Sequence, residues 1–133
     1  MRTRNLSAAV LGLLVAVAVG LGILAIGGPE TARQERRDQA RLSDLSGLKS
    51  YVQCITREDG ALPDTLPPNR SCGRDVRFTD PATGDAYVYD RLSDREYKLC
   101  ASFERPELLS GRRYLMLQID PTTGCTTQRV TIN

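Results

Sequence analysis

The longest uncharged segment of the chain is an apolar run near its N-terminus, which reads LSAAVLGLLVAVAVGLGILAI from Leu6 to Ile26. A helix of these 21 residues, rising about 1.5 Å per residue, matches a bilayer's hydrocarbon core of about 30 Å. Charged residues flank the run on both sides. We therefore predict a single-pass membrane protein with a cytoplasmic N-terminus at 1–5 and a transmembrane helix at 6–28. The residues expected to span the membrane include Leu6, Leu11, Leu14, Leu21 and Ile26.

A cleaved secretory signal peptide is the alternative interpretation of the same run. The apolar region of a signal peptide usually covers about 7–15 residues and ends at a small-x-small cleavage site. The run in this chain is longer than that, which favours a retained anchor, although Ala25-Ile26-Gly27 resembles a cleavage site. Cleavage there would release a secreted, disulfide-braced binding module.

All four cysteines, Cys54, Cys72, Cys100 and Cys125, follow the apolar run. An even number of cysteines in a small domain indicates disulfides formed in an oxidising compartment. Zinc sites usually need close pairs such as C-x-x-C, whereas the intervals here are 18, 28 and 25 residues and the chain has no histidine. We predict two disulfides in a domain outside the cytoplasm. Four cysteines allow three pairings, and Cys54–Cys72 with Cys100–Cys125 is favoured; free thiols in a cytosolic domain are the alternative.

A polar segment with helical periodicity extends from Glu30 to Arg57. Pro29 suits the first turn of a helix, and Gly60 suits a left-handed C-terminal cap. The first half, ETARQERRDQA, has almost nothing to bury, so we expect a polar helical stalk at 29–41. The second half carries an apolar stripe spaced by three or four residues, which predicts the core face of an α+β domain at 42–133. This face consists of Leu42, Leu45, Leu48, Val52 and Ile55.

The remainder of the chain has the short alternating runs of an antiparallel sheet. Residues 86–89 and 96–103 flank the turn sequence LSDR and predict one hairpin. Residues 114–119 and 126–132 predict a second hairpin around DPTTG. We therefore expect the helix to pack on a small antiparallel sheet.

The pattern D-P-x-T-G occurs twice, at 80–84 and at 120–124. The aspartate suits a hydrogen bond to the backbone ahead of it, proline presets φ, and glycine supplies a positive φ. A calcium site needs several oxygen ligands, and each segment offers one carboxylate. We therefore predict two tight turns and no metal site.

Composition argues against several classes of function. Without histidine the commonest general base is missing, and cysteines in disulfides are not nucleophiles. Setting aside Arg2 and Arg4, 16 basic residues balance 16 acidic ones. This balance leaves no excess positive charge of the kind that binds nucleic acid. The acidic pairs Glu58-Asp59 and Glu104 with Glu107 are interpreted as solvated. We expect no enzyme, cofactor, nucleic acid or small-molecule substrate; the contacts expected are with membrane lipid, through the N-terminal helix, and with a protein.

Three stretches together resemble type IV pilin-like proteins, in particular the major pseudopilin of type II secretion systems. They are DQARLSDLSGLKSYVQCITREDGALPDTL (38–66), FTDPATGDAYVY (78–89) and YKLCASFE (97–104). The resemblance implies a helix packed on a small antiparallel sheet, in a protein of the bacterial inner membrane with its C-terminal domain in the periplasm. It also implies a non-enzymatic function in the cell envelope through protein–protein contacts.

Two features of that family do not match this sequence. The region that corresponds to the prepilin leader and mature N-terminus reads NLSAAVLGLL, without the leader's glycine followed by phenylalanine and the helix glutamate. The last residues, TTGCTTQRVTIN, do not form the acidic calcium loop of the major pseudopilin. The resemblance therefore predicts the fold more directly than it predicts incorporation into a fibre.

Overall fold

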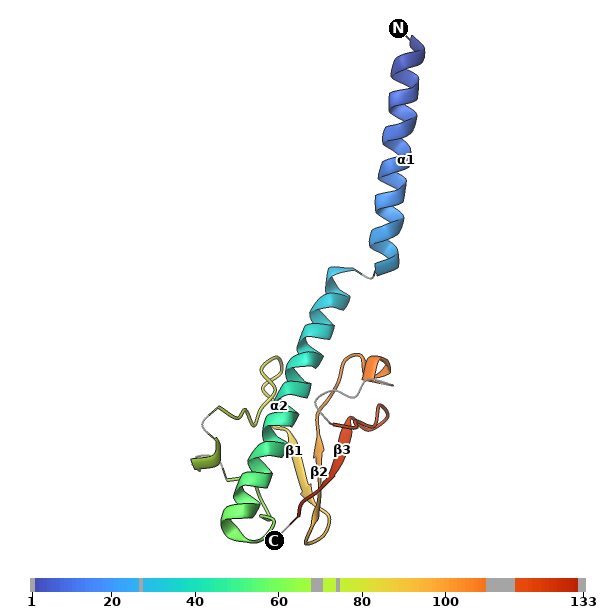
Figure 1. Cartoon of the computed structure of the whole chain (residues 1–133). Helices are drawn as coiled ribbons and strands as arrows, with labels where there is room; N and C mark the ends of the chain where they lie inside the picture. Colours follow the sequence, from blue (N-terminus) through green and yellow to red (C-terminus); the bar gives the residue numbers. More distant parts are fainter. Residues whose placement is uncertain (1, 27, 68–70, 74, 110–116, 132–133) are drawn as a thin grey trace. The chain divides into compact units, whose positions relative to one another are not determined.

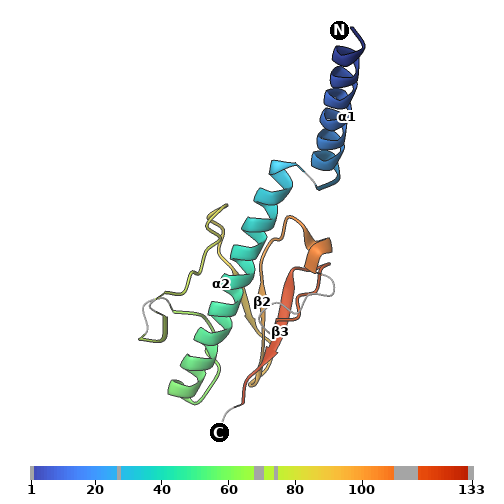
Figure 2. The same cartoon turned by 45° about the horizontal axis from the view of Figure 1, so that its top comes forward.

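The protein combines helices with one small sheet, as Figures 1 and 2 show for a computed structural model that describes residues 2–26, 28–67, 71–73, 75–109 and 117–131. The chain divides into two units, Met1–Gln34 and Glu35–Asn133. The first contains helix α1 (Arg2–Ile26) and the start of helix α2 (Pro29–Asp59). The second contains the rest of α2 and a three-stranded antiparallel sheet, so the α+β prediction is confirmed.

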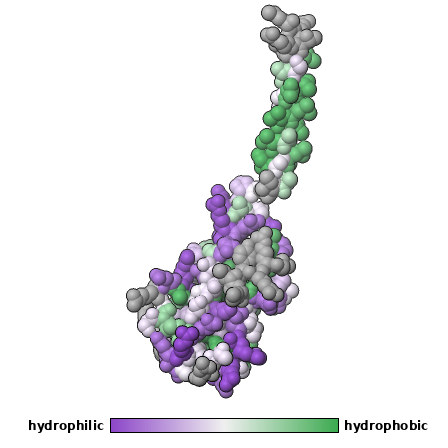
Figure 3. Space-filling view, viewed as in Figure 1, coloured by the Kyte–Doolittle hydropathy of each residue, from purple (hydrophilic) through white to green (hydrophobic). Residues whose placement is uncertain are grey.

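Helix α1 is apolar around its whole circumference. Its large apolar side chains between Leu6 and Leu24 are 51–80% exposed, and Figure 3 shows them as a continuous hydrophobic surface. Within the described residues, α1 is the one helix long and apolar enough to cross a bilayer. Of the residues expected to span the membrane, Leu6, Leu11, Leu14 and Leu21 are exposed on α1, and Ile26 is its last residue.

Both ends of α2 are set by the residues that the sequence indicated. The carbonyl of Gly28 accepts a hydrogen bond from the amide of Thr31 at 3.0 Å, and Pro29 is the first helical residue. At the other end, Gly60 has φ of 72° and its amide donates to the carbonyl of Thr56 at 2.9 Å. A residue with positive φ cannot continue a right-handed helix, so α2 ends there.

The sheet contains strands β1 (Val88–Arg91), β2 (Glu96–Cys100) and β3 (Cys125–Arg129), with β2 in the centre. Side chains alternate along β2: Tyr97 and Leu99 are fully buried, and the residues between them are half-buried. The predicted first hairpin is confirmed, since β1 pairs antiparallel with β2 across the turn.

The predicted second hairpin is present around its turn, where Asp120 and Cys125 form an antiparallel bridge, but not as two paired strands within the described residues. Residues 114–116 lie outside the described residues, and 117–119 do not belong to a strand, although Leu117 is buried in the core. Strand β3, which covers part of the predicted 126–132, pairs with β2. Alternation along a sequence shows that a segment suits a sheet, but it does not specify which strand becomes its neighbour.

The hydrophobic core lies between α2 and one face of the sheet. All five residues of the predicted helix face are at most 3% exposed. Three of them, Leu45, Leu48 and Val52, form the core cluster with Leu62 from the loop after α2, Tyr97 and Leu99 from β2, and Leu117 and Val130 near the end of the chain. The apolar stripe of α2 therefore packs against the buried side chains of the central strand β2.

The folded unit begins earlier on α2 than the predicted boundary at Leu42. It starts at Glu35, and within the predicted stalk Asp38 and Arg41 are 5% and 1% exposed. A polar stretch of helix is expected to be solvated because burying an unpaired charge is costly. Here the two side chains neutralise each other and bind further partners, which makes their burial tolerable.

Two disulfides close loops around this core. Cys54 on α2 is bonded to Cys72, which holds the proline-rich loop against the helix. Cys100 on β2 is bonded to Cys125 on β3, and the two residues lie directly opposite each other in the sheet. These are the pairings that the sequence analysis favoured, and no free cysteine is present.

The two D-P-x-T-G segments form the same turn. In the first, the amide of Ala82 donates to Asp80 Oδ1 and the amide of Gly84 to the carbonyl of Asp80, both at 2.8 Å. Asp120, Thr122 and Gly124 repeat these contacts at the same distances. The glycines have φ of 81° and 68°, as the pattern predicted.

The equivalent turns give a matched test of the packing around Gly124. Alanine at either glycine must adopt positive φ, at a cost of about 1–2 kcal/mol. A Cβ at Gly84 would meet nothing within 4 Å, whereas at Gly124 it would collide with the carbonyl oxygen of Ala101. We expect Gly124→Ala to destabilise the protein clearly more than Gly84→Ala in denaturant unfolding followed by tyrosine fluorescence. Equal losses would contradict the close approach of this turn to Ala101.

Candidate functional site

Three of the acidic residues singled out in the sequence, Glu58, Glu104 and Glu107, contact other side chains. Glu104 binds Arg37 and Arg41, and Glu107 binds Arg105. Glu58 accepts a hydrogen bond from Ser71 and lies beside the Cys54–Cys72 disulfide. Sulfur atoms bonded to each other are not the thiolates that zinc requires, so this group is no zinc site while the disulfide is intact.

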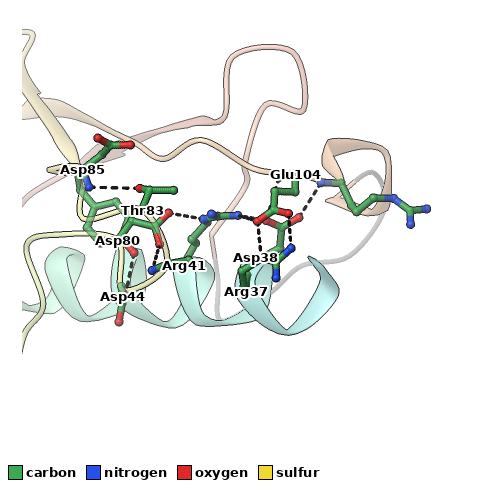
Figure 4. Close-up of polar contacts among 11 residues, drawn as sticks. Arg37, Asp38, Arg41, Asp44, Asp80, Thr83, Asp85 and Glu104 are labelled. Atoms are coloured by element: carbon green, nitrogen blue, oxygen red, sulfur yellow. Dashed lines mark hydrogen bonds and ion pairs between the residues drawn. The ribbon is translucent and has the colours of Figure 1, made fainter. Parts of the chain in front are cut away.

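A polar cluster surrounds the buried guanidinium of Arg41 (Figure 4). Its Nε donates to Asp80 Oδ2 at 2.5 Å, and its Nη1 donates to Asp38 Oδ1 at 2.6 Å and to Glu104 Oε1 at 3.0 Å. These carboxylates come from α2, from the first D-P-x-T-G turn and from the segment after β2. Arg41 therefore joins three parts of the chain that are far apart in sequence.

Asp38 links the same helix to the backbone of a second segment. Besides Arg41, its carboxylate accepts the amide N–H of Glu104 at 3.0 Å and that of Arg105 at 2.7 Å. Both amides lie just before the short 3-10 helix Pro106–Leu109. This carboxylate accepts hydrogen bonds from two backbone amides and one guanidinium. These hydrogen bonds offset the free-energy cost of burying its charge.

Glu104 completes the cluster at its more exposed side. Arg37 approaches it in a two-pronged geometry, with Nε donating to Oε1 and Nη2 donating to Oε2, each at 2.7 Å. This is the arrangement in which an arginine binds a carboxylate most strongly. With Arg37 included, two arginines face three carboxylates, which leaves one excess negative charge.

A second polar group lies one turn further along α2. Asp44 is buried and accepts a hydrogen bond from Tyr87 Oη at 2.8 Å, while Arg77 Nε lies 3.2 Å from its other oxygen. Burial, and then the hydrogen bond to Asp44, raise the pKa of Tyr87. The tyrosine therefore keeps its proton, donates a hydrogen bond to Asp44 and fastens the segment before β1 to α2.

The ion pairs hold the cluster in its charged form. The hydrogen bond from Arg37 is the largest cause that lowers the pKa of Glu104 from 4.5 to about 2. Burial by itself raises the pKa of Asp80, but hydrogen bonds from the amide of Ala82 and from Arg41 outweigh it and the net shift is downward. Burial by itself lowers the pKa of Arg41, because it also disfavours the charged form of this group. The hydrogen bonds to its three carboxylate partners outweigh burial, and the net shift of the pKa is upward.

This arrangement is suited to holding segments together. Each charged group of the cluster is engaged by an oppositely charged group, and the shifts move the titrations of Glu104, Asp80 and Arg41 away from neutral pH. General acid–base catalysis depends on a pKa near the working pH. The cluster instead fastens the first D-P-x-T-G turn and the Glu104 segment to α2.

The sequence analysis missed this cluster, although a signal for it was present. Asp38 and Arg41 extend the line of Leu45, Leu48, Val52 and Ile55 toward the start of α2, at alternating intervals of three and four residues. Positions on one such line share one face of a helix. Charged residues that follow the same spacing as an apolar stripe therefore lie on the buried face of the helix, where they are expected to form buried polar contacts.

No family model, curated protein or solved structure matches the chain.

The Arg41 cluster makes a testable contribution to stability. Arg41→Met removes the charge and leaves Asp38 and Asp80 buried without their cation, which typically costs about 3–5 kcal/mol. Arg36→Met is the control, because Arg36 is exposed on the same helix and such substitutions change stability by about 0.5 kcal/mol or less. Tyrosine fluorescence during denaturant unfolding reports on the folded unit, since α1 has no tyrosine. Similar losses in both variants would contradict a central role of Arg41.

Acid should weaken the protein in a defined pH window. Above about pH 5, Glu104 is ionised in both the folded and the unfolded state, and its stabilisation is fully present. As the pH falls from 4.5 toward about 2, the unfolded chain binds a proton that the folded protein does not bind. Stability therefore falls across this window.

Glu104→Gln tests this assignment. We expect the difference in Tm between the natural protein and the variant to be largest above about pH 5 and to shrink toward pH 2. Thermal unfolding at several pH values measures it. A difference that stays constant down to pH 2 would show that the Glu104 pairs do not cause the acid sensitivity.

Proposed function

We propose that this protein is a single-pass protein of the bacterial inner membrane whose disulfide-braced domain lies in the periplasm and acts through contacts with another envelope protein. The proposal includes a pseudopilin-like architecture and no catalytic activity. The observation that carries it is the combination of an exposed apolar helix with a domain in which all four cysteines are paired.

The exposed surface of α1 supports the membrane part of this proposal. A protein in water rarely exposes a contiguous apolar surface of this kind unless a membrane or another protein covers it. Exposed apolar side chains occur at successive positions along α1 instead of forming one stripe, which fits surrounding lipid better than the groove of a single partner protein. The 25 residues of α1 are enough to span a bilayer.

The disulfides support an extracytoplasmic domain. Disulfides persist in oxidising compartments and are rare in the bacterial cytosol. The longer loop, closed by Cys100–Cys125, has a sequence separation of 25 residues. In the chain-entropy model, each of these bonds is worth about 3 kcal/mol, a large fraction of the stability of a small domain.

The arrangement of α2 on the sheet supports a pseudopilin-like protein with a binding role. The core face of α2 lies on a three-stranded antiparallel sheet, which is the architecture that the sequence resemblance implies. The outward face of the sheet bears cross-strand ion pairs, Asp90 with Lys98 and Glu96 with Arg129. We assign protein contacts to the exposed start of α2 and to the sheet.

Intact mass measurement on membrane and periplasmic fractions tests the proposal. We expect full-length protein in the membrane fraction, lighter than the fully reduced chain by the four hydrogens, about 4 Da, that two disulfides remove. Alkylation without reductant should modify no cysteine. A maleimide that does not cross membranes should label the protein in intact spheroplasts only after reduction.

Two other results would contradict the proposal in different ways. A shortened, soluble, oxidised form in the periplasm would show that α1 is a cleaved signal sequence and that the domain is a secreted binding module. A full-length form with four reactive thiols would place the domain in the cytosol. A variant in which all four cysteines are replaced by serine is the control for labelling.

A further inference from the structure

A cavity of about 420 Å³ lies between the last turns of α2 and the end of β3. Gln53, Thr56 and Arg57 line it from the helix, and Arg129 and Thr131 line it from the strand and the residues after it. Figures 1 and 2 both place these two elements beside each other at this end of the unit. The cavity lies wholly within Glu35–Asn133, so it is independent of the fate of α1.

The lining of this cavity is rich in hydrogen-bond donors. The described lining residues contribute two guanidinium groups, two hydroxyls and an amide, and none of them contributes a carboxylate. Three other cavities of the same unit each include at least one acidic side chain. Paired arginines with neutral donors around them match the planar oxygens of a carboxylate.

Two of these donors have no partner among the residues that the structure describes. Thr56 is 3% exposed, and its Oγ1 makes no hydrogen bond to any described group. Arg57 forms no ion pair within the described part of the chain, whereas Arg129 is bound to Glu96. A buried hydroxyl without a hydrogen bond destabilises a protein. A carboxylate oxygen bound in the cavity would give this hydroxyl the partner that it lacks.

We propose that this cavity binds a carboxylate group. Arg57 and Arg129 contact its oxygens, and the Thr56 hydroxyl, which is closed off from water in the free protein, donates a hydrogen bond to it when the side chain rotates toward the cavity. The carboxylate belongs either to a small free acid or to an acidic side chain of a peptide, and the test distinguishes these sources. Arg57 also sits in the last turn of α2, where a positive charge suits the helix dipole, so its binding role needs a readout other than stability.

The experiment is an NMR titration of the full chain in detergent, following the Nε–H signals of Arg57 and Arg129. The probes are succinate and the blocked peptide acetyl-Gly-Glu-Gly-amide, with acetyl-Gly-Gln-Gly-amide as the uncharged control. We expect saturable shifts with at least one acidic probe and none with the glutamine peptide. Binding of succinate alone identifies a small acid as the ligand, and binding of the glutamate peptide identifies an acidic side chain.

Three variants test the assignment of the donors. Arg57→Gln should raise the Kd about tenfold. Arg36→Gln, which removes the same charge from an exposed position earlier on α2, should leave it unchanged. Thr56→Val should raise the Kd about fivefold and raise the Tm of the free protein by about 4 °C.

The opposite signs of the Thr56→Val effects separate a binding hydroxyl from a structural one. A lower Tm with an unchanged Kd would overturn the role of Thr56. Shifts that do not saturate with either acidic probe, or equal losses of affinity in Arg57→Gln and Arg36→Gln, would overturn the site.

Discussion

The folded unit depends on a single face of α2. This face contributes the helix residues of the hydrophobic core, and it also binds the first D-P-x-T-G turn and the Glu104 segment through polar side chains. Its later turns carry the apolar side chains that meet the sheet, and its earlier turns carry Asp38, Arg41 and Asp44. The apolar half removes water from β2, and the polar half binds loops that have few apolar residues to bury. Weakening this face anywhere therefore disturbs segments that are distant in sequence.

The buried charges are tolerable only as a connected set. A lone buried arginine would lose its hydration without compensation, but Arg41 has carboxylate partners from α2, the first turn and the Glu104 segment. The two D-P-x-T-G turns illustrate the difference that context makes. Both use aspartate to hold their own backbone, yet only Asp80 also reaches the arginine, whereas Asp120 remains exposed.

In the function we propose, α1 is surrounded by membrane lipid and the second unit is surrounded by water. The apolar circumference of α1 suits lipid, and the charged surface of the second unit suits water (Figure 3). Small domains have modest cores, and here two disulfides supplement a cluster of eight buried residues in the described part of the chain. The donor-lined cavity near Arg57 adds a place where such a domain recognises an acidic group, separate from the charge cluster that supports its fold.

Sequence alone determined the features that depend on local patterns. The length of the apolar run, the stripe from Leu42 to Ile55, the cap at Gly60 and the glycines of the two turns all follow from periodicity and backbone preference, and the structure has each of them. Tertiary structure alone decided that β3 pairs with β2, that Asp38 and Arg41 are buried, and that Arg57 and Arg129 line one cavity. The physical reason is that these contacts join residues far apart in the chain. Their energies depend on which groups are brought together and shielded from water, and no local pattern records that.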